Sequence, residues 1–407
     1  MCFNYSQASY DRDRYTEQYL ATQPADAAKD KVVAVTGATG NGLGLKFAMN
    51  AARLGASKVV LLNRASERAL KAEAMLKAAA PDTCHVVTVE CDLTSLDSVR
   101  AVAPKLSEAC GGALDVLMLN AGVMASPDET TADGYNREVQ LNVIAQLLLL
   151  KGAMPLLEAA AELCGEARIC TQTSGARKIG GGILPVFFDK VPAGGLPAPL
   201  GGDVSKGMFS IPPAWVRYGQ TKLANAMSAM ILHEKLHAKG SKVKALSVAP
   251  GLAATDLQVT NSASRRRFVA AGRPNARSGP FAYAQHSPNR TRFSPGLFSL
   301  ARLTQETTQK MGAMKAWQIH LMFLLRGQSA NDGALPMTHA CLMPDVESGS
   351  MYQPSFQHGG FGPPMCIASQ GKFMPEYVKG DVHTISTDEE KAAFWEMIEK
   401  ACGGPIV

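Results

Sequence analysis

Short apolar runs alternate with amphipathic stretches through most of the chain. The runs have the length and the β-branched content of buried strands, and they lie at residues 31–35, 59–62, 86–89, 114–119, 168–171 and 244–248. Apolar residues at helical spacing lie between or after them, most clearly at 45–54, 135–154 and 218–231. Strands that alternate with helices predict an α/β protein with a doubly wound parallel sheet and helices on both faces.

The first predicted strand leads directly into a glycine-rich turn. Residues 36–44 read Thr-Gly-Ala-Thr-Gly-Asn-Gly-Leu-Gly, and a predicted helix follows at once. A strand, a glycine turn and a helix form the phosphate-binding unit of a Rossmann-type fold, where backbone N–H groups and the helix N-terminus approach a pyrophosphate. We therefore expect dinucleotide contacts from Thr36, Gly37, Gly40, Asn41, Gly42, Leu43 and Gly44. The alternative is a tight structural turn without a ligand.

The next two strands end in further candidates for cofactor binding. An NAD-preferring site usually carries an acid after the second strand, but here the strand ends in Asn63-Arg64. Arg64 can face a 2′-phosphate, which favours NADP(H) over NAD(H), although it can also simply end a strand. Asp92 and Leu93 follow the third strand. Asp92 either contacts an adenine edge or caps a helix that starts near Thr94.

Other candidates follow the later strands. Ligands of such folds lie beyond the carboxyl ends of the strands. At these ends the chain places Asn120, Ala121 and Gly122 after the fourth strand, Thr173 and Ser174 after the fifth, and Pro250, Gly251 and Thr255 after the sixth.

Tyr218 and Lys222 form the strongest chemical signal. A Tyr four residues before a Lys on a helix puts both side chains on one face, one turn apart. An ammonium beside a phenol favours the phenolate, so the pKa of the Tyr falls and the residue becomes a usable general acid or base. The pair alone is weak evidence, because such a spacing arises easily by chance. The ordered motifs upstream give it its force.

These motifs together resemble the short-chain dehydrogenase/reductase family, most of all the branch of retinol dehydrogenases and light-dependent protochlorophyllide reductases. The resemblance covers about residues 31–354, apart from two insertions. It rests on the glycine turn, Asp92-Leu93, Asn120-Ala121-Gly122, Asn142, Ser174, Tyr218-x-x-x-Lys222 and Pro250-Gly251-x-x-x-Thr255.

The resemblance implies a role for each catalytic candidate. Tyr218 would donate a proton to a carbonyl oxygen, and Ser174 would hydrogen-bond and polarise that oxygen. Lys222 would bind the nicotinamide ribose and lower the pKa of Tyr218. Asn142 would hold a water that links Lys222 to solvent, and Thr255 with the turn before it would contact the nicotinamide carboxamide. Two alternatives stay open, since Thr173 can replace Ser174 and Asn142 can be a buried amide that satisfies backbone groups.

Two features depart from the family pattern. Four residues separate Gly37 from Gly42, one more than the family usually has, so the extra residue bulges outward or loosens the pyrophosphate contacts. Ser174 and Tyr218 are also farther apart than usual. The insertion at about 178–214 contains Phe187 and Phe188 and is expected to form a flap over the substrate cleft.

The second insertion, at about 258–325, occupies the place of the family's substrate lid. It contains a helix candidate at 311–325, which packs in the core or forms an apolar wall for a lipophilic substrate or membrane. The expected division is an N-terminal extension (1–30), one Rossmann-type domain with both insertions near the substrate cleft (31–355) and a C-terminal tail (356–407). In the tail, Thr387 and the acids after it predict a helix start.

Composition and charge limit the partners. The net charge is +6, and the segment 265–302 is rich in Arg and Pro without a single acid. It predicts a solvated loop, with an anionic membrane surface or an acidic partner as alternatives. No aromatic-interleaved basic motif indicates nucleic-acid binding. The 9 cysteines show no metal-ligand spacing, no run of 18 apolar residues predicts a spanning helix, and the cytoplasm is the expected location.

The sequence therefore predicts an NADP(H)-dependent oxidoreductase that interconverts an alcohol with an aldehyde or ketone. The substrate is expected to be small, bulky in shape and apolar, because both insertions flank the cleft. Protochlorophyllide-type reduction of a C=C bond is a second reading. A non-catalytic NADP-sensing protein is a third, from a different class. Homo-oligomer formation is left open.

Overall fold

The structure is a computed structural model of the chain. It describes residues 13, 15–179, 181–191, 213–251, 253, 255, 328–354 and 387–407. The segment 265–302, the helix candidate at 311–325 and most of the first insertion lie outside the described residues.

A seven-stranded sheet forms the centre of the molecule, with the strand order β3-β2-β1-β4-β5-β6-β7. Neighbouring strands of this sheet are all paired in parallel. The strands are β1 (Val32–Thr36), β2 (Lys58–Asn63), β3 (His85–Glu90), β4 (Val116–Leu119), β5 (Ala167–Gln172), β6 (Val243–Val248) and β7 (Met351–Tyr352). The prediction of an α/β fold with a doubly wound parallel sheet is confirmed. The strand order reverses between β1 and β4. In parallel sheets of this kind, ligands bind at such a reversal, outside the carboxyl ends of the strands.

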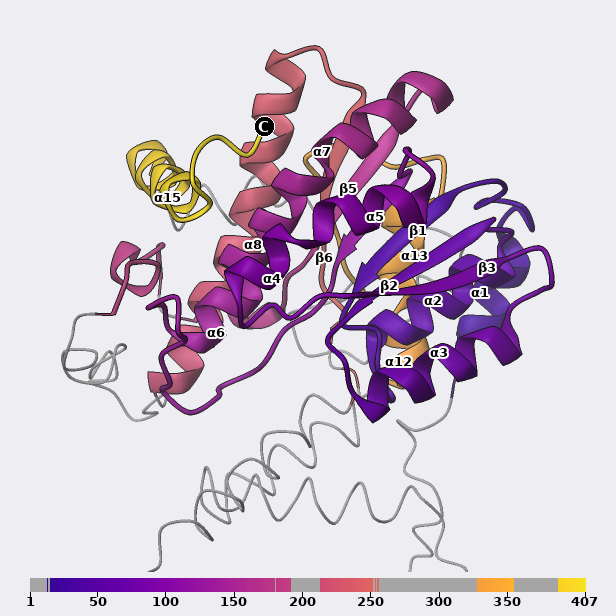
Figure 1. Cartoon of the computed structure of the whole chain (residues 1–407), viewed down its shortest axis with the longest axis horizontal. Helices are drawn as coiled ribbons and strands as arrows, with labels where there is room; N and C mark the ends of the chain where they lie inside the picture. Colours follow the sequence, from indigo (N-terminus) through magenta and orange to yellow (C-terminus); the bar gives the residue numbers. More distant parts are fainter. Residues whose placement is uncertain are drawn as a thin grey trace, which may run out of the picture.

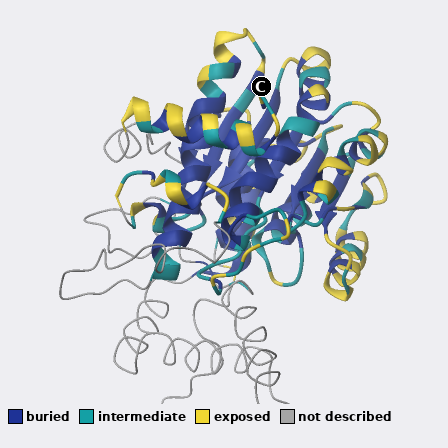
Figure 2. Ribbon diagram, turned by 60° about the vertical axis from the view of Figure 1, so that its left-hand side comes forward, coloured by how far each residue is buried: buried dark blue, intermediate teal, exposed yellow. Residues whose placement is uncertain are grey.

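Helices cover both faces of the sheet. One face carries α1 (Thr16–Thr22), α2 (Leu43–Arg53), α3 (Glu67–Ala79), α12 (Ala330–Gly333) and α13 (Leu335–Leu342). The other carries α4 (Leu96–Arg100), α5 (Val102–Cys110), α6 (Arg137–Val139), α7 (Ala145–Cys164) and α8 (Pro213–Ala238), with α15 (Asp388–Ala401) against α8. Buried residues gather in the sheet and on the helix faces that meet it (Figure 2). The two apolar cores therefore lie on opposite sides of one sheet.

The long helix before β5 has a break that its sequence does not show. The predicted element at 135–154 begins as α6, passes through a π-helical turn, η1 (Gln140–Ile144), and continues as α7 to Cys164. Residues 137–164 are long and apolar enough to span a membrane, but 72% of the apolar 18-residue stretch within them is buried inside the fold. This stretch is a core helix of the domain.

The described part of the first insertion packs against the C-terminal helix. The 3-10 helix η3 (Pro185–Phe187) buries Phe187 and Phe188, which are 2% and 1% exposed. The Phe188 ring meets the edge of Phe394 on α15 at 5.1 Å between centroids. The two aromatic rings therefore pack in the core between η3 and α15, and the flap over the substrate cleft stays a prediction.

The C-terminal helix starts where the sequence predicts it. Thr387 is the N-cap of α15, and a capping box joins it to Glu390 in both directions. Phe394, Trp395 and Ile398 then face the core. The Lys151 ammonium on α7 donates to the carbonyl of Cys402 at 3.2 Å, so the end of the chain is anchored to the domain.

The N-terminal helix is anchored to the segment before β7. The Asp332 carboxylate accepts hydrogen bonds from the backbone N–H groups of Tyr15 and Thr16 at 3.1 and 3.0 Å. The Tyr19 hydroxyl lies 2.9 Å from Nδ1 of His339 on α13, in a buried contact. Residues before β1 are therefore packed on the domain from Tyr15 onward.

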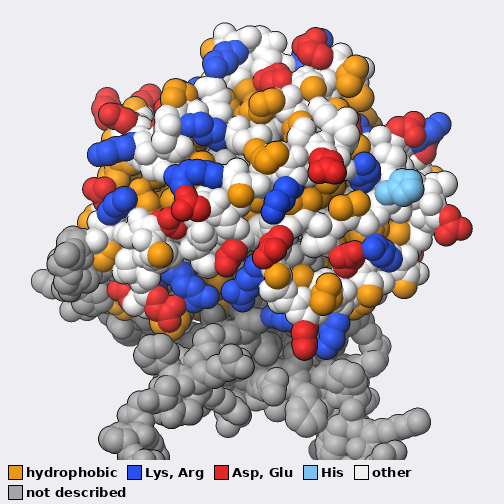
Figure 3. Space-filling model, viewed as in Figure 1, with side chains coloured by type: hydrophobic (Ala, Val, Ile, Leu, Met, Phe, Trp, Pro, Cys, Tyr) orange, Lys and Arg blue, Asp and Glu red, His pale blue; other side chains and the backbone are white. Residues whose placement is uncertain are grey.

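Charged side chains are interspersed on the surface seen in Figure 3. Lys and Arg alternate with Asp and Glu over this face of the described residues. Mixed charge of this kind is typical of an ordinary solvated surface.

Candidate active site

The end of β1 is locked to the turn after β4. The Thr36 hydroxyl accepts hydrogen bonds from the backbone N–H groups of Asn120 at 3.0 Å and Ala121 at 2.9 Å. The Asn120 amide donates to the Thr36 carbonyl at 2.8 Å. Gln146 on α7 completes the lock, since its Nε2 donates to the Ala121 carbonyl at 2.8 Å. Thr36 and Asn120 thus shape the floor of the predicted cofactor site.

The glycine turn is fitted closely onto this floor. Gly37 has φ +70°, and a Cβ there would lie 2.8 Å from Cα of Ala121. A Cβ on Gly44 would lie 2.5 Å from the Asn120 amide nitrogen. Larger residues have no space at either position, so the two glycines permit the contact between the turns.

The N-terminus of α2 has the features of an anion site. Gly42 is the N-cap, no side chain caps the helix, and its first turn contains no acid. Open N–H groups and the positive end of the helix dipole suit a pyrophosphate. Gly40, with φ +57°, is half-buried beside exposed Asn41 and half-buried Leu43. The residues present at this helix N-terminus therefore fit the pyrophosphate of a dinucleotide.

The ends of β2 and β3 lie at the same edge of the sheet. Asn63 is buried, and its Nδ2 donates to the Ala38 carbonyl at 3.2 Å. Its Oδ1 has no hydrogen-bond partner within the described residues. Arg64 follows as an exposed side chain. A polar buried atom and a free guanidinium beside the glycine turn fit the recognition of an adenosine ribose.

Asp92 is half-buried, with Leu93 buried after it, and it does not cap α4. Its carboxylate accepts from the N–H and the hydroxyl of Thr94 at 2.9 and 2.7 Å, which fixes the turn before the helix. Ser95 is the N-cap instead, because its hydroxyl accepts from the N–H of Ser98. The capping alternative is thus wrong by three residues.

Tyr218 and Lys222 lie one turn apart on α8, as predicted, and Ser174 meets them. Tyr218 is 5% exposed, and its ring centroid lies 5.7 Å from Nζ of Lys222. The half-buried Ser174 hydroxyl is a hydrogen-bond partner of the Tyr218 phenol. A serine hydroxyl, a phenol and an ammonium therefore converge at the carboxyl end of β5.

The expected depression of the Tyr218 pKa is absent from the protein alone. Burial raises the pKa of Tyr218, the Ser174 hydrogen bond lowers it by a smaller amount, and the charge of Glu138 raises it further. Burial also lowers the pKa of Lys222 to about 8, and Glu138 opposes that shift. The prediction of a low Tyr218 pKa is therefore wrong here, because desolvation outweighs the hydrogen bond from Ser174.

Thr173 and Ser174 have different partners. The Thr173 hydroxyl donates to the Lys222 carbonyl at 2.6 Å and is 1% exposed. The Thr173 hydroxyl is therefore already hydrogen-bonded to the backbone of α8, whereas the Ser174 hydroxyl faces Tyr218. The geometry thus favours Ser174 as the hydroxyl that meets a substrate.

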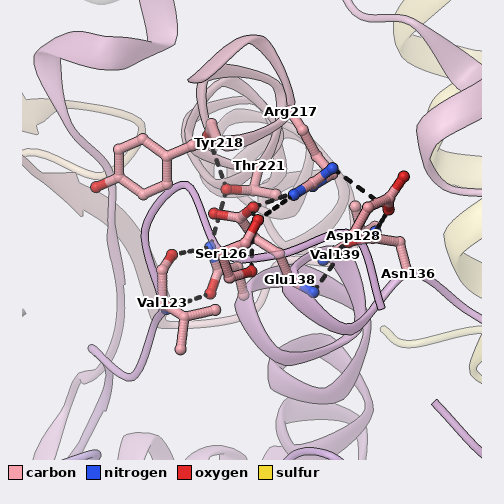
Figure 4. A network of polar contacts seen from close by, with 10 residues as sticks. Val123, Ser126, Asp128, Asn136, Glu138, Val139, Arg217, Tyr218 and Thr221 are labelled. Atoms are coloured by element: carbon pink, nitrogen blue, oxygen red, sulfur yellow. Dashed lines mark hydrogen bonds and ion pairs between the residues drawn. The ribbon is translucent and has the colours of Figure 1, made fainter. Parts of the chain in front are cut away.

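Asn142 lies in the π-helical turn η1 and bridges to two segments. Its Oδ1 accepts from the N–H of Val123 at 2.8 Å, and its Nδ2 donates to the Val123 carbonyl at 2.9 Å and the Thr221 hydroxyl at 3.0 Å. Figure 4 shows Val123, Thr221 and Tyr218 around this bridge. The expected water link remains a prediction, while the buried-amide alternative describes the contacts observed.

Gly122 lies between the catalytic candidates. A Cβ on it would lie 3.3 Å from Oδ1 of Asn142 and 3.4 Å from Nζ of Lys222. Gly219 plays a similar part on α8, because a Cβ there would lie 2.8 Å from the Ala176 carbonyl oxygen. This close approach brings the segment after Ser174 against the Tyr218 turn.

The loop after β6 is tied to the chain that returns before β7. Gly251 has φ +71°, and Gln328 donates from its side chain to the Pro250 carbonyl. Ala253 and Gln328 form a parallel bridge, and Thr255 beyond it is half-buried. The predicted nicotinamide loop therefore follows the strand that neighbours Ser174.

Sequence reasoning missed several residues that hold the site. The Lys222 ammonium donates to the Gln172 carbonyl at 3.0 Å, and Asn225 donates to the same oxygen at 2.9 Å. Gln146 and Thr221 support the loop after β4. Most of these hydrogen bonds are accepted by backbone carbonyls. Every residue has a backbone carbonyl, so the sequence does not indicate which one will accept a hydrogen bond.

Comparisons with known proteins agree with this architecture. Residues 31–182 match the family model of short chain dehydrogenases. Polyprenol dehydrogenase of Mus musculus is 31% identical over 227 residues, which cover 56% of this chain and 61% of that protein. Retinol dehydrogenase 13 of Homo sapiens is 33% identical over 229 residues, covering 56% and 60%. The matches thus span less than two thirds of either relative.

A solved structure shows the same fold over nearly the whole chain. The crystal structure of an uncharacterized protein from Mycobacterium Paratuberculosis aligns with a TM-score of 0.55 and 22% identity, and it covers 95% of this chain and 98% of that one. The similarity of the sequences agrees with three features of the structure: the glycine turn, the sheet order and the set of Ser174, Tyr218 and Lys222. The chain is therefore similar to the short-chain dehydrogenase/reductase family, most directly over residues 31–182.

Proposed function

We propose that this protein is an NADP(H)-dependent oxidoreductase that interconverts an alcohol with its aldehyde or ketone. The observation that carries the proposal is the meeting of Ser174, Tyr218 and Lys222 at one end of the sheet. The glycine turn and the uncapped N-terminus of α2 belong to the same edge. A dinucleotide seated there would bring its nicotinamide toward the Tyr218 turn.

The chain's own residues would manage the substrate oxygen. A nicotinamide, when bound, supplies or accepts the hydride. During reduction, negative charge develops on the carbonyl oxygen, and Ser174 stabilises it by donating a hydrogen bond. Tyr218 then gives that oxygen its proton. Because burial raises the pKa of Tyr218, the phenol is protonated at neutral pH and is ready for reduction.

Lys222 would hold a positive charge beside the cofactor ribose. Its pKa of about 8 leaves the ammonium form dominant at neutral pH. The Gln172 carbonyl fixes the direction of this ammonium, and the Thr173 hydroxyl fixes the backbone of the same residue. Asn142 would hold the neighbouring loop in place.

Arg64 supports NADP(H) as the preferred cofactor. It is exposed directly after β2, where the sequence has Asn63 in place of an acid. A guanidinium there attracts a 2′-phosphate, whereas an acid would bind a free 2′-hydroxyl.

The substrate class we propose is an apolar alcohol or aldehyde of isoprenoid type. Two of the relatives are named for polyprenol and retinol. Reduction of a C=C bond is less well supported, because the protochlorophyllide branch usually has a Cys before the Asn and lacks the Gly of Asn120-Ala121-Gly122.

The test is cofactor oxidation by the purified protein with a panel of apolar aldehydes and ketones, retinal and a short polyprenal included. We expect turnover with NADPH that exceeds turnover with NADH by tenfold or more, the factor that about 1.4 kcal/mol of binding energy provides. Equal use of both cofactors would contradict the role of Arg64. Tight NADPH binding without turnover of any compound would favour an NADP-sensing protein.

A further inference from the structure

A buried ion pair lies directly beside the Tyr218 turn. The Glu138 carboxylate accepts a hydrogen bond from Nε of Arg217 at 3.1 Å, and the two side chains are 0% and 3% exposed (Figure 4). Arg217 immediately precedes Tyr218, and Glu138 lies four residues before Asn142. Apolar residues of similar volume often stabilise a core as well as a buried ion pair does. Stability alone therefore does not account for the pair.

Arg217 connects three segments that surround the site. Its Nη2 donates to the Ser126 carbonyl at 2.5 Å, and its Nη1 lies 3.4 Å from the Asp128 carboxylate. Glu138 is held in turn by the Asn136 side chain, which accepts a hydrogen bond from the Glu138 N–H at 3.0 Å. The loop after β4, the start of α6 and the helix α8 thus meet at one guanidinium.

The same three segments are joined a second time by Asn142. Val123 in the loop and Thr221 on α8 are its partners, as Ser126 and Glu138 are the partners of Arg217. The two cross-links lie on either side of the Tyr218 position along α8. On the other helix, Glu138 lies just before the π-helical turn η1, and Asn142 lies within it. Single π-helical turns in long helices are common at functional sites.

The charge of Glu138 reaches the reactive side chains. It raises the pKa of Lys222, against the burial that lowers this pKa to about 8, and it raises the pKa of Tyr218. Burial raises the pKa of Glu138 itself to about 7, and Arg217 opposes that shift. The charged or titratable groups facing Glu138 and Lys222 are Arg217 and Tyr218 on α8 and Asp128 on the loop.

Resting on the proposed function, we propose that Glu138 and Arg217 form a positioning pair for the active site: they lock the loop 123–128 onto the Tyr218 turn and set one buried negative charge within reach of Lys222. Neither side chain contacts reacting atoms, and both act through Tyr218 and Lys222. As a result, Lys222 keeps its proton to a higher pH than burial alone would allow.

The first arm of the test needs no cofactor and no turnover. A double-mutant cycle of Glu138→Gln with Lys222→Met is measured by urea unfolding between pH 6 and 9. We expect the two effects to be non-additive between about pH 7 and pH 8, where Glu138 and Lys222 both carry charge. They should be additive near pH 6, where Glu138 is protonated, and near pH 9, where the ammonium is lost. Glu129→Gln is the matched control, because Glu129 pairs with Arg137 at 3.0 Å on a more exposed side of the same segments.

The second arm is the pH profile of kcat/KM for carbonyl reduction. Removal of the Glu138 charge lowers the pKa of Lys222, so the basic limb of the profile should move to lower pH by about half a unit or more. The limb of Glu129→Gln should coincide with that of the wild type. If Glu138→Gln fails to fold with Arg217 left unpaired, the charge-free pair Glu138→Leu/Arg217→Met replaces it in both arms.

The outcomes separate this proposal from the proposed function. Non-additivity together with a shifted limb supports the positioning pair. Additive effects at every pH, or an unmoved limb in a folded variant that turns over, overturn it. Absence of turnover in the wild type contradicts the proposed function, while the unfolding cycle still decides whether Glu138 acts on Lys222.

Discussion

Two adjacent hydroxyl residues, Thr173 and Ser174, show how one position decides a chemical role. The Thr173 hydroxyl donates a hydrogen bond to the Lys222 carbonyl at 2.6 Å. The Ser174 hydroxyl is a partner of the Tyr218 phenol. Residue type does not distinguish them, since both can donate and accept. The groups that surround each hydroxyl distinguish the two residues.

Substitution of these two residues should therefore have different effects. Ser174→Ala removes a donor to the developing oxyanion, and we expect kcat to fall by roughly 10² or more. Thr173→Val removes a buried hydrogen bond, so it should destabilise the fold by about 1 kcal/mol and reduce kcat far less. Steady-state kinetics and urea unfolding of both variants check this. Equal losses of kcat would contradict the assignment.

At this scale the sequence predicted which residues meet, but not how they are tuned. Ser174, Tyr218 and Lys222 follow from their places at a strand end and on one helix face. The pKa of Tyr218 did not, because its direction depends on how completely the helix is buried. The carbonyl of Gln172 as partner of Lys222 was also not predictable, since any residue offers a carbonyl.

Among the elements, α8 carries most of the candidate catalytic residues. It brings Arg217, Tyr218, Thr221 and Lys222 to the site within two turns. Gly219 allows this face to approach the segment after Ser174. The spacing of these residues was readable from the sequence, whereas the close approach at Gly219 required the structure.

The helices α1 and α13 form a buried contact between elements on the opposite face of the sheet. Burial lowers the pKa of His339 on α13 from 6.5 to about 4, against an opposing effect of the Asp345 charge. The unfolded chain thus binds a proton on His339 at a pH where the folded chain does not. The contribution of the neutral imidazole to the free energy of unfolding is present above about pH 6.5 and is lost as the pH falls toward 4.

His339→Gln tests this contact through the pH dependence of stability. The free energy of unfolding of the wild type minus that of the variant should decrease by on the order of 2 kcal/mol between pH 7 and pH 4.5. Urea unfolding of both proteins at each pH measures it, and the buried Glu138 cancels because both proteins contain it. A difference that stays constant with pH would show that His339 titrates alike in both states.

Element boundaries were the least predictable feature. The break at η1 has no Pro or Gly to signal it, and β7 has only two residues, too few for a strand pattern. The residues 181–191 were expected to cover the cleft because of their place in an insertion. Their two phenylalanines pack against α15, about 200 positions later, a contact no local pattern reveals.

For the whole molecule, the sequence predicted the fold class because strands and helices alternate from residue 31 onward. Sheet order then followed the usual crossover rules, with the switch point between β1 and β4. The site lies at that edge, where the carboxyl ends of β1, β4 and β5 meet. The packing of α1 and of the segment after α15 onto the domain depends on long-range contacts, such as Tyr19 with His339 and Lys151 with Cys402, and was not predicted.

The central claim is that Tyr218 transfers a proton in a nicotinamide-dependent reaction. The most direct measurement compares the wild type with Tyr218→Phe, in NADPH binding and in NADPH oxidation with an apolar aldehyde. For Tyr218→Phe we expect a Kd for NADPH close to that of the wild type and a kcat lower by about 10² to 10⁴, because the phenol is removed and the fold is kept. An unchanged kcat would contradict the account.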